Sequence, residues 1–75
     1  MTNTEMYRLD IGYSVRQLSI ETGVDRHAIY RIEDGLGKKI YDRTYFRLAK
    51  VFSIKTGKDI KEIYKELLED KEYIS

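Results

Sequence analysis

Four side chains between residues 26 and 31 are of the types that read DNA bases: Arg26, His27, Tyr30 and Arg31. On a helix, which turns by about 100° per residue, these four fall on one arc and the aliphatic residues of the segment fall on the opposite arc. An arginine on such an arc presents a planar fork of donors to the O6 and N7 atoms of guanine. The pattern predicts a helix that packs by its aliphatic arc and offers its polar arc to a major groove.

Each of these residues also has a plainer interpretation. Arg26 and Arg31 are also what a solvated surface helix carries, and His27 is either a groove residue or an inert surface group. His27 is the single histidine and the chain has no cysteine, so we expect no zinc site, no catalytic dyad and no cofactor. Ser14, His27 and an aspartate are the three residue types of a hydrolytic triad, but no glycine-rich oxyanion turn surrounds Ser14. We therefore expect a protein that is not an enzyme.

The charge is unevenly distributed, although the net charge is only +1. Residues 26–58 hold nine basic and three acidic side chains, which gives +6, whereas residues 1–25 sum to −2 and residues 59–75 to −3. A basic segment between two acidic ends is typical of a polyanion binder. The alternative is a solvated surface on which the charge happens to be uneven.

The elements that must position these residues all have helical periodicity, and the chain has no proline. We expect one domain over residues 1–75, all-α, with a frayed tail at about 70–75. The predicted helices cover about 4–11, 15–22, 26–34, 43–56 and 60–69. The predicted N-caps are Thr2 or Asn3, then Ser14 (in a capping box with Gln17), Asp25, Asp42 and Asp59.

The last two predicted helices each have one apolar face. Residues 45, 48, 49 and 52 form the first face, and residues 60, 63, 64 and 67 form the second. Both faces indicate core packing rather than an interface. The apolar surface extends onto Leu68, Tyr73 and Ile74, and this overflow indicates a partner.

The composition excludes several classes. Of the 75 residues, 41% are hydrophobic and 36% are charged, and no apolar run approaches the roughly 18 residues that a membrane span needs. Residues 1–5 show neither the basic region nor the apolar run of a secretory signal. We expect a cytoplasmic protein that has no membrane partner and no small-molecule ligand.

Residues 14–35 resemble the helix-turn-helix of the Cro and lambda-repressor family, also called the XRE group. The resemblance lies in the Ser14–Gln17 start, the Gly23-Val24 turn with its polar cap Asp25, and the closing Ile-x-x-x-Glu-x-Gly that ends at Gly35. It implies a compact five-helix, lambda-repressor-like domain with its helix-turn-helix at about 14–34. It also implies a transcriptional regulator, usually a repressor, that binds a palindromic operator in double-stranded DNA as a homodimer.

The resemblance also implies roles by position. Arg26, His27 and Arg31 stand where base edges are read, with Tyr30 beside them. The phosphate contacts would come from Ser14, Arg16, Gln17, Lys38, Lys39 and Arg43. Arg8 and Glu33 stand where an ion pair ties the first helix to the end of the recognition helix.

Two other functions stay open on the same fold. One is a protein–protein interaction module, which the carboxylates of Asp25 and Asp34 near the docking surface favour. The other is the DNA-binding antitoxin of a toxin–antitoxin pair. The nine basic residues between 26 and 58 favour the DNA-binding regulator.

Overall fold

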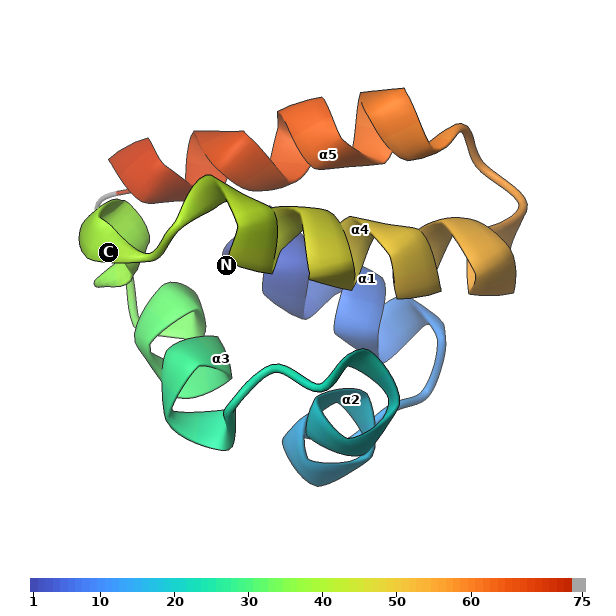
Figure 1. The fold of residues 1–75 in the computed structure, drawn as a ribbon, viewed down its shortest axis with the longest axis horizontal. Coiled ribbons are helices and arrows are strands. Elements are labelled where there is room, and N and C mark those ends of the chain that lie inside the picture. The colour runs from blue at the N-terminus through green and yellow to red at the C-terminus, as the bar shows by residue number, and fades with distance from the viewer. Residues whose placement is uncertain (74–75) are drawn as a thin grey trace.

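Five α-helices and two short 3-10 helices form the described part of the chain, residues 1–73 of the computed structural model. They are α1 (Asn3–Asp10), α2 (Val15–Thr22), α3 (Arg26–Glu33), η1 (Gly37–Lys39), α4 (Asp42–Thr56), α5 (Ile60–Leu68) and η2 (Glu69–Glu72). Figure 1 shows α4 and α5 side by side, with α2 and α3 on the side of α4 away from α5. The predicted all-α, five-helix fold is confirmed, and the α-helix bounds agree to within one residue.

Local capping sets the start of α2 and of α3. The Ser14 hydroxyl accepts the backbone N–H of Gln17 at 3.0 Å, and the Asp25 carboxylate accepts that of His27 at 2.7 Å. Both caps are as predicted, because a short polar side chain satisfies a backbone donor that the first turn leaves free. The Gln17 side chain does not return the bond to Ser14, as a capping box requires, but donates to Glu21 at 3.0 Å.

The predicted role of Asp42 is wrong. Tyr41 occupies the cap position of α4, and Asp42 is the first residue inside the helix. The Asp42 carboxylate instead pairs with the Lys71 ammonium at 2.6 Å. A carboxylate in the first turn still complements the positive end of the helix dipole, so the residue type fits although the position differs.

The prediction of a frayed tail is also wrong over residues 70–73. Asp70 is 2% exposed and its carboxylate accepts the backbone N–H groups of Asn3 and Thr4 at 2.8 Å each and the Thr4 hydroxyl at 2.6 Å. The Tyr73 hydroxyl binds the N-terminal ammonium at 2.5 Å. The tail therefore caps α1 and joins the two ends of the chain. The remainder of the predicted tail, residues 74–75, lies outside the described residues, and so does the predicted apolar overflow onto Ile74.

The core lies where all five α-helices meet. Tyr7 of α1 stacks on Phe52 of α4 at 5.3 Å between ring centroids. The other buried apolar side chains are Leu18, Val24, Ile29, Ile32, Tyr45, Leu48, Ala49, Ile63 and Leu67. Within residues 1–73, no helix combines the length and the apolar character needed to cross a membrane.

Candidate nucleic-acid interface

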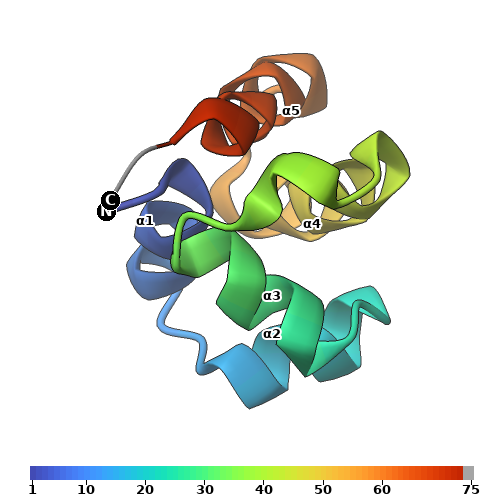
Figure 2. The same ribbon diagram turned by 90° about the vertical axis from the view of Figure 1, so that its left-hand side faces the viewer.

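The helix α3 has one buried face and one exposed face. Ile29 and Ile32 are completely inaccessible to solvent, and the four predicted base-reading residues, Arg26, His27, Tyr30 and Arg31, are all exposed. Figure 2 shows α2 and α3 together at the end of the molecule farthest from α5. The predicted arc is therefore open to an approaching partner over the length of the helix.

Hydrogen bonds connect the end of α2 to the turn that precedes α3. The Ser19 hydroxyl donates to the carbonyl of Val24 at 2.6 Å. The Thr22 hydroxyl donates to the Leu18 carbonyl at 2.7 Å and accepts the N–H of Val24 at 3.1 Å. Gly23 closes α2 with φ of 74°, a left-handed conformation that glycine adopts without steric cost. These contacts hold the turn that leads into α3 against the end of α2.

An ion pair fixes the other end of α3. The Arg8 guanidinium donates to both oxygens of Glu33, at 2.7 and 2.9 Å, and to the Tyr13 carbonyl at 2.9 Å. The two side chains are only 12% and 9% exposed, and the hydrogen bonds to Glu33 raise the pKa of Arg8. The predicted pairing of Arg8 with Glu33 is confirmed, and it ties α3 to α1.

The basic loop after α3 is held in place by a buried tyrosine. The Tyr45 hydroxyl donates to the carbonyl of Gly37 at 2.9 Å, and a Cβ at position 37 would collide with that hydroxyl. Burial raises the pKa of Tyr45 well above its ordinary value. Lys38 and Lys39, the next two residues of η1, are both exposed. The bond from Tyr45 to Gly37 positions the backbone that carries them.

The first turn of α4 adds a further cation. The Arg43 guanidinium lies over the ring of Tyr41, 4.8 Å from the ring centroid, which is a cation–π contact. Tyr41, which is 68% exposed, was not predicted as a site residue. Arg47 and Lys50 were not predicted as site residues either, and they continue from Arg43 along the exposed side of α4. Their spacing of four and three residues places all three cations on one face of a helix and could have identified them from the sequence.

The candidate interface as a whole is exposed and cationic. All ten predicted site residues are exposed: Ser14, Arg16, Gln17, Arg26, His27, Tyr30, Arg31, Lys38, Lys39 and Arg43. Among the described residues, none of the basic members forms an ion pair. Asp25 and Asp34 are also exposed, at the two ends of α3. The surface therefore holds free positive charge with a carboxylate at each end of α3.

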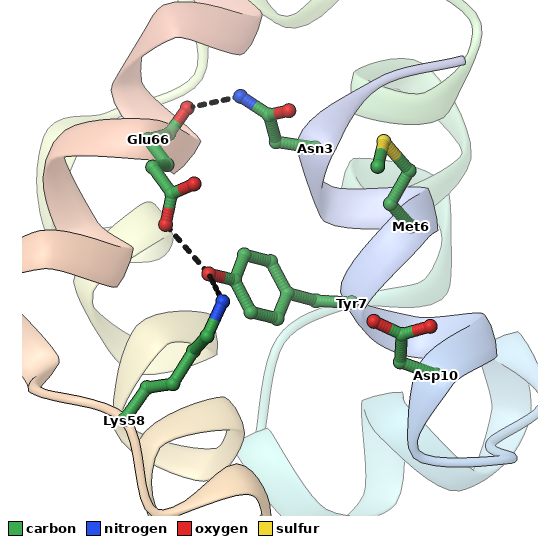
Figure 3. A pocket seen from close by; sticks show the side chains of 6 residues that line it. All are labelled: Asn3, Met6, Tyr7, Asp10, Lys58 and Glu66. Atoms are coloured by element: carbon green, nitrogen blue, oxygen red, sulfur yellow. Dashed lines mark hydrogen bonds between the residues drawn. The ribbon is translucent and has the colours of Figure 1, made fainter.

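A hollow of about 100 Å³ between α1 and α5 is a second candidate (Figure 3). The Tyr7 hydroxyl in it donates to Glu66 at 2.5 Å and accepts from the Lys58 ammonium at 3.4 Å. Burial and the Glu66 carboxylate raise the pKa of Tyr7. These three groups satisfy one another, so the hollow presents no activated group. In the described part of the chain, no three His, Cys, Asp or Glu side chains are placed to hold a metal ion.

Comparison with protein-family models, with curated proteins and with solved structures finds no match. The resemblance to the Cro and lambda-repressor family therefore stays a prediction from the sequence. The function of this chain has to be inferred from its own geometry and charge.

Proposed function

We propose that this protein is a sequence-specific DNA-binding transcriptional regulator, and a repressor in its simplest form, that places α3 in the major groove. The observation that carries the proposal is the exposed arc of α3. Arg26, His27, Tyr30 and Arg31 stand free on this arc while Ile29 and Ile32 anchor its opposite side. Arginine, histidine and tyrosine are side chains that contact base edges and phosphates.

The dimensions and the surroundings of α3 support the same function. Its eight residues span about 12 Å, and the major groove is about 12 Å wide. Ser14 caps α2 by a single bond to Gln17, which leaves the other N–H groups of the first turn to meet a phosphate, with Arg16 beside them. Lys38, Lys39 and Arg43 would contact the phosphates that flank the groove.

The proposal includes a homodimer on a palindromic operator, because two copies related by a two-fold axis present two α3 helices to successive turns of the groove. In this proposal the protein acts in the cytoplasm by binding, without catalysis, cofactor or metal. The hydroxyl of Ser14, the one candidate nucleophile weighed from the sequence, is already occupied as the cap of α2.

The test is selection of bound fragments from random or parental genomic DNA, followed by titration of the selected duplex at several salt concentrations. If each protomer neutralises about four phosphates, a dimer gives a slope of log K against log salt near about −7. A scrambled duplex of equal length is the control for specificity. Failure to bind any duplex at low salt contradicts the proposal.

A protein–protein module is the second candidate, and Asp25 and Asp34 favour it because exposed carboxylates beside α3 repel phosphates. The same titration separates the two functions. A slope indistinguishable from zero, or no binding at low salt, supports the protein partner.

A further inference from the structure

The exposed side of α1 is apolar at its centre and acidic at its edges. Met6 and Leu9 are 50% and 51% exposed, although the opposite side of the helix packs into the fold through the buried Thr4 and Tyr7. Glu5 and Asp10 lie on the same side of α1 as these two apolar residues, and Met6 and Asp10 also line the rim of the hollow that contains Lys58 (Figure 3). We call Glu5, Met6, Leu9 and Asp10 the α1 face.

A groove between α4 and the end of α2 combines apolar residues with two cations and one carboxylate. Its volume is about 180 Å³, and Glu21 and Thr22 of α2 form one wall. The α4 side consists of Arg47, Lys50, Val51 and Ile54, which we call the α4 face. Ile54 is 78% exposed, the largest exposed fraction among the large apolar side chains of the described residues.

The two faces match in composition and oppose in charge. Within residues 1–73, neither Arg47 nor Lys50 forms an ion pair, and Asp10 forms none either. Glu5 has only a long contact, at 3.9 Å, to Arg8. The Glu21 carboxylate in the other wall of the groove already accepts hydrogen bonds from the Tyr13 hydroxyl at 2.7 Å and the Gln17 amide at 3.0 Å, which leaves the two cations of the α4 face as the unpaired charges of the groove among the described residues. A patch of positive charge favours a partner patch of negative charge. We propose that the α1 face of one copy of this chain docks in the α4 groove of a second copy.

The placement of the two faces decides the symmetry of this contact. Figure 2 shows α1 and α4 on opposite flanks of the molecule, with α3 between them, and the exposed side of each points away from the core they share. A docked copy therefore keeps its own α4 groove open for a third copy. Such a head-to-tail contact is heterologous and builds an open row of molecules unless the rotation between copies closes it into a ring, whereas a two-fold contact uses the same face twice.

The row leaves α3 and the ten site residues predicted from the sequence free, but it engages Arg47 and Lys50, the two cations that continue the basic surface along α4. None of Arg26, His27, Tyr30 or Arg31 belongs to either face, and neither do Lys38, Lys39 and Arg43. Docking of one copy on another does not require DNA, so the protein alone suffices for the test. Each face has four residues, far fewer than the 20–30 residues a side of a standard interface, so we expect a weak contact that salt weakens further.

Disulfide trapping detects such a weak contact, because the chain has no cysteine of its own. Two single-cysteine variants, Leu9→Cys and Ile54→Cys, are oxidised separately and as an equimolar mixture at low salt. We expect the mixed disulfide dimer to form several-fold faster than either symmetric dimer. In the docked contact position 9 of one copy faces position 54 of the other, and only the mixture has a cysteine at both positions. Leu36→Cys, at a 57% exposed residue outside both faces, is the matched control in mixture with each variant.

A charge reversal makes the test specific. Asp10→Lys in the Leu9→Cys chain, or Lys50→Glu in the Ile54→Cys chain, is expected to slow the mixed dimer to the rate of the control. Combining the two reversals is expected to restore the rate. Both positions are exposed, and circular dichroism verifies that each variant is folded. Equal rates for mixed and symmetric dimers, or no rescue by the double reversal, would overturn the proposal.

Discussion

Two arginines of this chain have opposite surroundings. Arg8 is 12% exposed at the side chain and donates to Glu33 and to the Tyr13 carbonyl. Arg31 lies on α3, two residues before Glu33, and is exposed with no ion pair among the described residues. The Arg8 guanidinium is engaged by hydrogen bonds within the fold, whereas the Arg31 guanidinium remains available to a partner.

The same division separates two regions of the molecule. Where α1 meets α3 and η2, polar side chains are shielded and bonded: Asp70 accepts three hydrogen bonds, and Glu33 accepts two. On the exposed arc of α3 and in the η1 loop, the cations stand alone. Buried polar groups must be paired to avoid a desolvation cost, whereas exposed cations cost little to leave free. The first region should therefore affect stability, and the second should affect binding.

The largest effect is expected at Asp70. Asp70→Ala leaves two backbone N–H groups and one hydroxyl without an acceptor at the start of α1, and we expect it to lower the free energy of unfolding by about 4 kcal/mol. Asp70→Asn, which keeps one acceptor oxygen, should cost less. Urea denaturation followed by circular dichroism measures both. The control is Glu69→Ala at the exposed neighbour, which should change stability by less than about 0.5 kcal/mol.

The second prediction concerns the ion pair itself. Arg8→Ala and Glu33→Ala should each lower the free energy of unfolding by about 3 kcal/mol, because each leaves a shielded charge without its partner. In a double-mutant cycle the two changes should couple by about 2 kcal/mol. Additive effects would show that the two charges act independently. Glu5→Ala, which removes only the 3.9 Å contact to Arg8, is the control with the smaller expected effect.

The local part of this architecture was predictable from the sequence. The caps Ser14 and Asp25 act on residues two or three positions away, so the signal that sets the start of each helix lies in the same few letters. Periodicity likewise placed Ile29 and Ile32 inside and Arg31 outside. Local rules of this kind need no knowledge of tertiary contacts.

The contacts between distant segments were not predictable in this way. Asp70 caps a helix that begins 67 residues earlier, and Lys71 pairs with Asp42 from 29 residues away. The sequence of residues 70–73 alone does not distinguish a segment that caps α1 from a solvated acidic tail. Arg43 and Tyr41 are close in sequence, yet their stacking depends on how the backbone turns into α4. Only the resemblance pointed to the long-range pair of Arg8 and Glu33.

The third prediction tests the exposed arginine. Arg31→Ala should leave the free energy of unfolding within about 0.5 kcal/mol of the parent, since surface changes away from packed features do little. On the selected operator it should cost about 2 kcal/mol per half-site, and on random DNA it should cost little, because a guanine contact is lost only where guanine is present. Titration of both duplexes measures this. An equal loss on both would mean that Arg31 holds phosphate.

The smallest effect is expected at Lys38, which lies in a loop that Tyr45 fixes through Gly37. From the loop its ammonium can hold a phosphate as a point charge, so Lys38→Ala should weaken operator and scrambled duplex alike and reduce the salt slope by about one per protomer. The matched control is Lys61→Ala, an exposed lysine on α5, at the end of the molecule opposite α2 and α3 in Figure 2. It removes the same charge and should leave the slope unchanged. If both variants reduce the slope equally, net charge rather than the η1 loop governs binding, and the contrast between paired and free cations then says nothing about where DNA docks.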